Sequence, residues 1–560
     1  MQLNGAQILI QTLIEQGVTD VFGYPGGQVI NIYDALYEYK DKINHVLTAH
    51  EQGASHAADG YSRATGKVGV CIATSGPGAT NLVTGIATAM LDSIPMVAIT
   101  GNVPCSLIGK DSFQEIDITG VTLPITKHNF FVSNIEELAD TIRQAFQIAK
   151  SGRPGPVLID IPKNVQVAKY DYEMQTVMEK TPLPKVKESE IDKAVEIIKN
   201  SERPYIYVGG GAAGLGLGKA IAEFADKIGA AIGCTFMGLS AIPQDYERFL
   251  GMQGMHGHYA SSMAQDQSDL IIGIGVRFSD RATGNVAKFA TKSKIIQIDP
   301  DFAEINKNVI VDLGLVGDVA DAFERMAKKC EGKSNPAWLA QIKRLQEEEN
   351  ALEEEIAQAN TASLTPKQMF DIINEVKKPN TVITTDVGQH QMWTAQYVKF
   401  DAPRRFVSSG GLGTMGFGLG AAMGAYTATK DPVVLITGDG SFGMNLNELA
   451  TAVTYKMPIV IVLMNNGVLG MVRQWQTLFF GKRYSNTVLD RKTDFVALAK
   501  AFGADGYLAE TPVEFKKAFE KAIANTDKPV VIDVRIDKDE VVLPMLPPGG
   551  AISDMITNIK

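Results

Sequence analysis

Short apolar runs recur along the chain, and two of them stand out because polar residues follow each one directly. Residues 433–437 lead into Gly438-Asp439-Gly440, and residues 458–464 lead into Asn465-Asn466. Apolar runs of this length, bounded by glycine and polar residues, are typical of buried strands, and residues 445–456 between them have a helical pattern. The sequence therefore predicts a strand–turn–helix–strand unit of a parallel sheet, where ligands bind beyond the carboxyl ends of the strands.

Asp439 and Asn466 each follow one of these two strands, so their side chains are expected to meet at one edge of the sheet. A carboxylate and an amide are too few for a closed calcium site, but they suit Mg²⁺, which completes its octahedron with a backbone carbonyl, water and phosphate oxygens. The adjacent glycines allow a phosphate to approach the backbone. This edge is therefore predicted to bind a diphosphate through magnesium.

An internal repeat relates this unit to a segment near the N-terminus. Residues 70–102 contain a strand, a glycine-rich turn, a helix beginning at Asn81, and a second strand ending at Asn102; residues 435–466 repeat this order with Asn445 and Asn466 at the same offsets. Only the second copy contains Asp439. Two related domains, one with the metal ligands and one without, suggest a cofactor that is held at both ends.

A further glycine-rich turn lies in the middle of the chain. Gly209-x-Gly211-x-x-Gly214 follows a strand-like run and precedes a helix-like segment, which is the context that a dinucleotide-binding turn needs. Arg277 and Asp299 follow two later strand-like runs and are candidates to bind pyrophosphate and ribose. Glycine-rich turns without a ligand are also common, and a surface salt bridge between Arg277 and Asp299 is the alternative.

We expect an α/β protein with three doubly wound parallel-sheet domains, the first and third related by the repeat. A polar, proline-containing linker spans 165–190, an amphipathic surface helix is expected over 343–358, and a Pro-Pro-Gly-Gly tail is a candidate for disorder or for a lid. The expected boundaries are 1–164 for the first domain, 190–330 for the middle domain, 365–545 for the third domain and 546–560 for the C-terminal tail.

Composition sets limits on partners and location. The formal net charge of −10 and the lack of a basic stripe argue against nucleic-acid binding. The four cysteines have no metal-ligand spacing and are expected to be reduced, and no apolar run is long enough to span a membrane. Because the N-terminus has no secretory signal pattern, a cytoplasmic protein is expected.

Gly438-Asp439-Gly440, followed after residues 441–464 by Asn465-Asn466, resembles the signature of thiamine-diphosphate enzymes. The resemblance implies their fold, in which one domain holds the diphosphate and the other the aminopyrimidine. In these enzymes the two domains come from different subunits, so an obligate homodimer, or a dimer of dimers, is expected.

Within that family the chain closely resembles the catalytic subunits of acetohydroxyacid (acetolactate) synthases, over nearly its whole length. The matching segments are 22–27, 50–54, 151–156, 254–257, 277–281, 411–416 and 471–475. The segments Gly254-Met255-His256-Gly257 and 277–281 resemble the flavin segment of these enzymes, which the flavin-free acetolactate synthases lack. Ser279 departs from the family, where aspartate is frequent.

The resemblance implies roles for individual residues. Glu51 is expected to share a proton with the pyrimidine ring, and the catalytic set is Glu51, Gln114 and Met415, the last of which props the bent cofactor. The implied metal ligands are Asp439, Asn466 and the backbone carbonyl of Val468. The remaining contacts to thiamine diphosphate are Gly388, Gln389, His390, Gly413, Gly438, Gly440, Ser441 and Met471.

The implied FAD contacts are Arg153, Gly209, Gly210, Gly211, His256, Gly257, Arg277, Asp299 and Asp318. Substrate contacts are expected from Phe113, Lys163, Arg277 and Trp475, with Arg277 on the acceptor carboxylate and Trp475 shaping the acceptor pocket. As alternatives, Trp475 and Phe113 are core aromatics.

The implied activity is decarboxylation of pyruvate followed by ligation to pyruvate or 2-ketobutyrate. The products are 2-acetolactate or 2-aceto-2-hydroxybutyrate, which feed branched-chain amino-acid synthesis, and FAD has a structural role because the reaction transfers no net electrons. Family members often bind a small regulatory subunit. A pyruvate oxidase or another carboligase on the same scaffold is the alternative, and an inactive cofactor-binding subunit is a third possibility.

Overall fold

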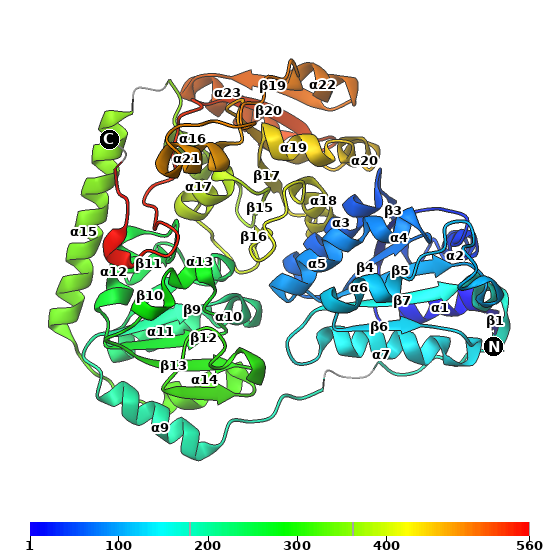
Figure 1. Cartoon of the computed structure of the whole chain (residues 1–560), viewed down its shortest axis with the longest axis horizontal. Coiled ribbons are helices and arrows are strands. Elements are labelled where there is room, and N and C mark those ends of the chain that lie inside the picture. Colours follow the sequence, from blue (N-terminus) through cyan, green and yellow to red (C-terminus); the bar gives the residue numbers. More distant parts are fainter. Residues whose placement is uncertain (178–180, 361–362, 559–560) are drawn as a thin grey trace.

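A computed structural model describes residues 1–177, 181–360 and 363–558 of the chain. In these residues it contains three six-stranded parallel sheets, each flanked by helices, and one short antiparallel pair formed by β1 (Gln2–Asn4) and β8 (Lys169–Asp171) (Figure 1). The expected α/β class with three doubly wound domains is confirmed. We name the domains first, middle and third by the order of their sheets in the chain.

The first domain has the strand order β3-β2-β4-β5-β7-β6. Its strands are β2 (Asp20–Tyr24), β3 (Asn44–Leu47), β4 (Gly69–Ala73), β5 (Met96–Asn102), β6 (His128–Phe131) and β7 (Pro156–Pro162). Its helices are α1 (Gly5–Glu15), α2 (Ile30–Glu38), α3 (Glu51–Thr65), α4 (Pro77–Asn81), α5 (Val83–Asp92), α6 (Ile118–Thr122), α7 (Leu138–Lys150) and α8 (Lys163–Val167).

The middle domain has the order β11-β10-β9-β12-β13-β14. Numbered within the domain this is 3-2-1-4-5-6, the order of dinucleotide-binding sheets, with its switch point between β9 and β12. Its strands are β9 (Pro204–Val208), β10 (Ala231–Cys234), β11 (Phe249–Met252), β12 (Leu270–Ile274), β13 (Lys294–Asp299) and β14 (Leu313–Val316). Its helices are α9 (Glu188–Lys199), α10 (Gly210–Leu215), α11 (Gly218–Ile228), α12 (Tyr259–Gln267), α13 (Asp280–Thr283) and α14 (Val319–Lys329).

The third domain has the order β16-β15-β17-β18-β20-β19, which matches the first sheet strand for strand and confirms the internal repeat. Its strands are β15 (Val382–Thr385), β16 (Phe406–Val407), β17 (Val433–Gly438), β18 (Ile459–Asn465), β19 (Asp505–Ala509) and β20 (Val530–Arg535). Its helices are α16 (Pro366–Val376), α17 (Gln389–Tyr397), α18 (Gly418–Thr429), α19 (Asp439–Asn445), α20 (Glu448–Thr454), α21 (Gly470–Phe479), α22 (Phe495–Ala501) and α23 (Pro512–Ala524).

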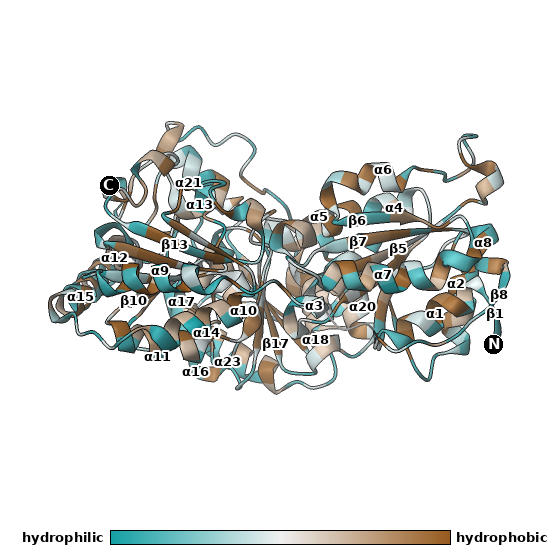
Figure 2. Ribbon diagram, turned by 90° about the horizontal axis from the view of Figure 1, so that it is seen from below, coloured by the Kyte–Doolittle hydropathy of each residue, from teal (hydrophilic) through white to brown (hydrophobic). Residues whose placement is uncertain are grey.

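Helices α3 and α18, which occupy equivalent places in the two repeats, pack against each other and join the first domain to the third (Figures 1 and 2). Glycines make the close approach possible: a Cβ on Gly60 would lie 2.2 Å from the carbonyl oxygen of Ala421, and one on Gly424 would lie 1.9 Å from that of Ala57. The central strands of all three sheets are apolar and buried between helices (Figure 2). The repeated domains are therefore held against each other along one tight helix pair.

Some elements differ from the sequence pattern. The helix expected over 445–456 is present as the shorter α20, and a separate helix, α19, which was not expected, precedes it from Asp439 to Asn445. The surface helix expected over 343–358 is the longer α15 (Pro336–Ala359), whose Trp338, Ile342 and Leu345 are buried against the middle domain. The described part of the tail also lies against the middle domain, where Leu546 N donates to Met255 O at 2.7 Å; residues 559–560 of the expected tail and 178–180 of the expected linker lie outside the described residues.

The four cysteines are free thiols, as expected. Within the described ranges, no helix combines the length and the apolar character that a membrane span requires.

Candidate active site

The carboxyl ends of β17 and β18 bring Asp439 and Asn466 to the same edge of the third sheet. The two strands are hydrogen-bonded neighbours, with Gly438 opposite Met464. Asp439 is the first residue of α19 and is only 7% exposed, and Asn466 follows β18 directly. Asn466 Oδ1 accepts a hydrogen bond from Val468 N at 3.1 Å, which fixes the segment that carries the third predicted ligand.

The electrostatic state of Asp439 fits a cation site. Burial raises the pKa of this carboxyl to about 6, and the opposing effect of Arg491 is smaller. A buried carboxylate without a close basic partner is stabilised by a bound cation. Carboxylate, amide and carbonyl oxygens are the donors that Mg²⁺ prefers, so this set of residues fits the metal.

The loops around Asp439 contain most of the other residues predicted to bind the diphosphate. His390 is buried beside Gly438, where a Cβ would lie 3.0 Å from its Nδ1, and its Nε2 has no hydrogen-bond partner. Gln389 Oε1 is 3.5 Å from Asn466 Nδ2, and Ser441 Oγ donates to Val387 O at 2.9 Å. We call these residues (Gln389, His390, Gly438, Asp439, Ser441 and Asn466) the cradle. Its polar side chains can bind a ligand, and its glycine leaves room for the ligand to approach the backbone.

Met415 lies over the same edge. A Cβ on Gly440 would be 3.8 Å from Met415 Cε, and the preceding Gly413 has a φ of +68°, which favours glycine. Met471 lies in α21, packed against the core. The structure therefore brings Met415 to the predicted diphosphate edge, as the proposed supporting role requires.

Glu51 is the first residue of α3, at the equivalent edge of the first sheet. Asn81 Nδ2 donates to Glu51 Oε2 at 3.0 Å, which orients the carboxylate. Its other oxygen, Oε1, faces Gly78, where a Cβ would come within 3.3 Å. One oxygen is thus held by the protein and the other faces a position without a side chain.

The two edges are separate within one chain. Across the described part of the protein, no hydrogen bond or ion pair joins Glu51 to the cradle around Asp439. Phe113, predicted to line the substrate pocket, is 83% exposed on the first domain, and the neighbouring Gln114 has a φ of +60°.

The glycine-rich turn of the middle domain lies at the switch point of its sheet. A Cβ on Gly209 would lie 1.9 Å from the carbonyl oxygen of Gly275, and one on Gly211 would lie 3.0 Å from Gly275 Cα. These two glycines are therefore required by close packing between the turn after β9 and the turn after β12. Gly210 begins α10, so its backbone is at the N-terminus of a helix beside the switch point.

The other residues predicted to bind FAD are spread around this switch point. Asp299 is buried, which raises the pKa of its carboxyl to about 6, and His256 is buried with Nδ1 unpaired. Gly257 is packed against Met252 and Gln253. Asp299 accepts from Asp301 N at 2.9 Å, so His256 Nδ1 is the unpartnered buried group of this pair, and such a group fits a bound ligand.

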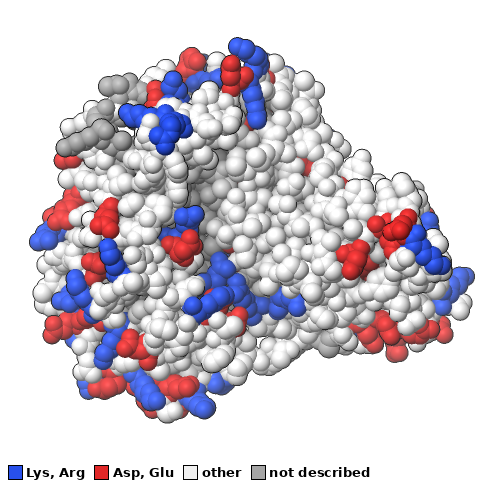
Figure 3. Space-filling view, in the orientation of Figure 1, with Lys and Arg blue, Asp and Glu red and all other residues white. Residues whose placement is uncertain are grey.

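Arg277, Arg153 and Asp318 have other partners in the chain. Arg277 donates to Leu91 O and lies 3.9 Å from Asp92, Arg153 Nη1 donates to Glu304 Oε1 at 2.5 Å, and Asp318 caps α14. No Arg277–Asp299 salt bridge occurs among the described residues. Basic side chains gather around the hollow at the centre of the face shown in Figure 3. The hydrogen bonds of Arg277 to Leu91 and of Arg153 to Glu304 connect the middle and first domains.

Trp475 lines a cavity of about 660 Å³ on the outer side of α21. Its ring stacks edge-on with Phe479, with centroids 5.8 Å apart, and its indole nitrogen is buried without a partner. Lys163 begins α8 in the first domain and does not line this cavity. The predicted substrate residues are thus divided between two domains of the chain.

Comparison with known proteins agrees with this geometry. Family models described as the N-terminal, central and C-terminal domains of thiamine pyrophosphate enzymes match residues 3–121, 191–326 and 386–534. The chain is 45% identical over all its residues to a probable acetolactate synthase large subunit of Methanocaldococcus jannaschii, covering 96% of that protein. It is 45% identical to the isozyme 2 large subunit of Escherichia coli, with full coverage of both, and 43% identical to the Corynebacterium glutamicum large subunit, of which it covers 90%. The chain belongs to the acetolactate synthase large subunits, a family of thiamine pyrophosphate enzymes.

As a member of this family, the chain has both thiamine-pyrophosphate-binding domains. The N-terminal match includes Glu51 and Asn81, and the C-terminal match includes Asp439 and Asn466. The two edges described above therefore lie in the two domains that bind the cofactor in this family.

Two buried acids near the cofactor domains' edges were not predicted from the sequence. Asp386 follows β15 and accepts from Gly416 N at 2.7 Å and from Gly418 N at 3.1 Å, so it holds the segment after Met415. Because Asp386 directly follows an apolar strand-like run, as Asp439 does, the sequence could have indicated that it lies at this edge. Glu448 is fully buried and accepts from the amides of Ala49 and His50, nearly 400 residues away, and no local pattern indicates that contact.

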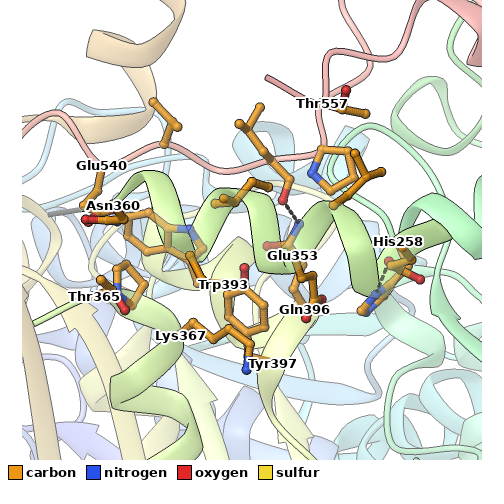
Figure 4. Close-up of a pocket in the computed structure, with 18 of the residues that line it drawn as sticks. His258, Glu353, Asn360, Thr365, Lys367, Trp393, Gln396, Tyr397, Glu540 and Thr557 are labelled. Atoms are coloured by element: carbon orange, nitrogen blue, oxygen red, sulfur yellow. Dashed lines mark hydrogen bonds and ion pairs between the residues drawn. The ribbon is translucent and has the colours of Figure 1, made fainter. Parts of the chain in front are cut away.

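A second cavity, of about 320 Å³, lies between α15, α16, α17 and the C-terminal segment (Figure 4). Ligand atoms of His258, Glu349 and Glu353 lie within 4.8 Å of one another there. His258 Nδ1 already shares a hydrogen bond of 2.9 Å with Glu349, and burial and then the Glu349 charge raise the pKa of Glu353. His258 and Glu349 therefore already satisfy each other, with Glu353 beside them.

Proposed function

We propose that this chain is the catalytic large subunit of an acetolactate synthase that uses thiamine diphosphate, Mg²⁺ and FAD. It would convert pyruvate, together with a second pyruvate or 2-ketobutyrate, to 2-acetolactate or 2-aceto-2-hydroxybutyrate in branched-chain amino-acid synthesis. The observation that carries the proposal is the Glu51–Asn81 pair in one thiamine domain together with Asp439 and Asn466 at the matching edge of the other.

In this proposal Asp439, Asn466 and the Val468 carbonyl would hold Mg²⁺, which neutralises the diphosphate. When bound, thiamine diphosphate would supply the nucleophilic carbon needed for decarboxylation of pyruvate and for transfer of the two-carbon unit to the second keto acid. Glu51 would exchange a proton through Oε1, because Oε2 is engaged by Asn81. Met415 would support the bent cofactor by apolar contact at this edge of the sheet.

The acceptor would be bound by shape and charge. Trp475 offers an apolar wall to the extra methyl of 2-ketobutyrate, and Arg277 suits a carboxylate. Phe113, Gln114 and Lys163 would contribute to the acceptor pocket from the first domain of a second copy. Within one chain, none of the three lines the cavity that contains Trp475. The lack of a hydrogen bond or ion pair between Glu51 and the cradle around Asp439, among the described residues, supports a homodimer, or a dimer of dimers.

The middle domain would hold FAD at its switch point, with a structural role. The order of its sheet, the N-terminus of α10 and the unpaired Nδ1 of His256 support this assignment. The relatives' designation as large subunits supports a small regulatory partner, and we propose a cytoplasmic location.

The direct test measures acetolactate from pyruvate with the purified chain, thiamine diphosphate and Mg²⁺, with and without FAD. Product that depends on all three cofactors supports the proposal. Product without any flavin would remove FAD from it, and reduction of flavin by pyruvate without acetolactate would indicate a pyruvate oxidase.

A further inference from the structure

Two buried carboxylates cross the interface between the first and third domains, one in each direction. Glu448, the first residue of α20 in the third domain, accepts from Ala49 N at 3.1 Å and from His50 N at 3.0 Å in the first domain. Asp92, the last residue of α5 in the first domain, accepts from Gly410 N at 3.0 Å and from Gly411 N at 2.7 Å in the third domain. Each carboxylate therefore binds two consecutive backbone amides of the other domain.

The segments that they bind precede two residues assigned to the cofactor. Ala49 and His50 lead directly into Glu51 at the start of α3, and Gly410 and Gly411 lead to Gly413 and Met415 before α18. Helices α3 and α18 are the equivalent helices of the internal repeat. The two contacts are thus reciprocal: each repeat anchors the turn that carries the other repeat's cofactor-facing side chain.

Both contacts are tightly built. The Glu448 side chain is fully buried and also accepts from Thr451 Oγ1 at 2.8 Å. The Asp92 side chain is likewise fully buried and accepts from Arg63 Nη2 at 2.9 Å. A Cβ on Gly53 would lie 2.0 Å from Glu448 Oε1, and a Cβ on Gly411 would lie 2.8 Å from Asp92 Oδ1. Each carboxylate therefore lies directly against a glycine, where a side chain would push the acid away from the amides that it binds.

The chemistry suits positioning. An ionised carboxylate that accepts two backbone N–H groups makes shorter and stronger hydrogen bonds than a neutral acceptor, and a negative charge is favoured at the N-terminus of a helix such as α3. An amide side chain in the same place presents one oxygen and one NH₂ group, so one backbone N–H would face another donor. Small displacements of a catalytic group reduce turnover strongly.

We propose that Glu448 and Asp92 are positioning residues, which set the place of Glu51 and of the Met415 segment from across the domain interface. Neither acid would touch substrate or cofactor. The importance of these segments for catalysis rests on the function proposed above, whereas the anchoring itself does not depend on it.

The test uses the full-length chain and compares Glu448→Gln, Asp92→Asn and a matched control, Glu15→Gln. Glu15 is a buried acid of the first domain that accepts from Arg143 and Tyr172, and among the described residues it has no hydrogen bond to α3, so its loss is expected to affect stability and not the anchors. Hydrogen–deuterium exchange is measured with and without thiamine diphosphate and Mg²⁺, for peptides covering 47–53 and 408–415. Turnover is measured in parallel as kcat and KM for pyruvate.

We expect Glu448→Gln to raise exchange in 47–53 about tenfold or more, to lower kcat by about tenfold or more, and to change KM by less than about twofold. Asp92→Asn should raise exchange in 408–415 and leave 47–53 unchanged. Glu15→Gln should lower the unfolding midpoint and move neither peptide. Unchanged exchange and kcat in Glu448→Gln would overturn the proposal, as would equal effects of Glu15→Gln on the two peptides.

If Glu448→Gln does not fold, Gly53→Ala tests the same contact from the other side. The added methyl would displace the carboxylate from the amides, so exchange in 47–53 should rise while Glu448 is retained. Normal protection of 47–53 in a folded Gly53→Ala variant would overturn the proposal. If the wild-type chain makes no acetolactate, the proposed function fails, but the exchange results still decide whether the two acids anchor these segments.

Discussion

Asn81 donates a hydrogen bond of 3.0 Å to Glu51, and its counterpart in the repeat, Asn445, donates one of 2.9 Å to the carbonyl of Gly416. The two asparagines end equivalent short helices, α4 and α19, and each reaches the turn before the helix that joins the domains. In one repeat this contact orients an acid, and in the other it fixes the segment behind Met415. The equivalent asparagines of the two repeats therefore have different roles, one orienting a carboxylate and the other holding a backbone segment.

Replacing Glu51 with Gln is expected to abolish most turnover while the cofactor still binds. The amide keeps the size of the side chain and can accept from Asn81, but it cannot take up a proton. A general acid–base group of this kind contributes about 10²–10⁴-fold, so acetolactate formation should fall by that factor. Calorimetric titration with thiamine diphosphate should give an affinity close to the wild type. Near-normal turnover would remove Glu51 from the mechanism.

Replacing Asn81 with Ala is expected to have a smaller effect of the same kind. The hydrogen bond to the Glu51 carboxylate is charge-assisted, and such bonds contribute about 1.5–3 kcal/mol. We expect kcat to fall roughly tenfold to a hundredfold, with little change in the unfolding midpoint because Asn81 is only half-buried. Replacing the exposed Thr80 with Ala in the same helix is the control. Equal activities of the two variants would show that Glu51 does not need this partner.

Asp439→Asn should stabilise the cofactor-free chain near neutral pH while it weakens Mg²⁺-dependent cofactor binding. Burial raises the pKa of Asp439 to about 6, above its value in the unfolded chain. The folded state therefore binds the proton more tightly, so the destabilisation from this group is absent below about pH 4 and develops as the pH rises to about 6. Above that range we expect a gain of about 1–3 kcal/mol in the free energy of unfolding for the variant.

The measurement is urea unfolding of both chains at pH 4 and pH 7, without cofactor, followed by titration with thiamine diphosphate and Mg²⁺. If Asp439→Asn retains the cofactor as tightly as the wild type, Asp439 is not a metal ligand. A variant that is less stable than the wild type at pH 7 would contradict the electrostatic argument.

Replacing Trp475 with Leu is expected to shift product choice toward 2-acetolactate when pyruvate and 2-ketobutyrate compete. One methylene in an apolar pocket contributes about 1–3 kcal/mol of discrimination, so a change of severalfold or more is expected. Phe479→Leu, which alters the ring that stacks on Trp475, serves as a neighbouring control. Product ratios from chromatography that match the wild type would exclude Trp475 from the acceptor pocket.

Local pattern was sufficient to predict the sheets and the convergence of Asp439 with Asn466, because strand ends of a parallel sheet must share an edge. It also found the repeat, whose two sheets have the same strand order. Pattern did not find α19, since the glycines around Asp439 indicate a turn where the chain already forms a short helix.

Long-range contacts explain most of what the sequence did not indicate. Glu448 resembles any acid at the start of a helix until the fold brings the amides of Ala49 and His50 to it. Gly209 and Gly211 matched a phosphate-binding spacing, yet their missing side chains are required by contact with Gly275. Arg277 faces Asp92 of another domain and not Asp299, because the domain arrangement, which local pattern does not specify, decides its partner.

The most direct measurement is acetolactate formation from pyruvate by the purified chain with thiamine diphosphate, Mg²⁺ and FAD, with each cofactor omitted in turn. The account predicts product only when all three are present, and about 10²–10⁴-fold less of it from the Glu51→Gln variant under the same conditions. Reduction of the flavin by pyruvate without acetolactate, or no reaction in the complete mixture, would contradict it.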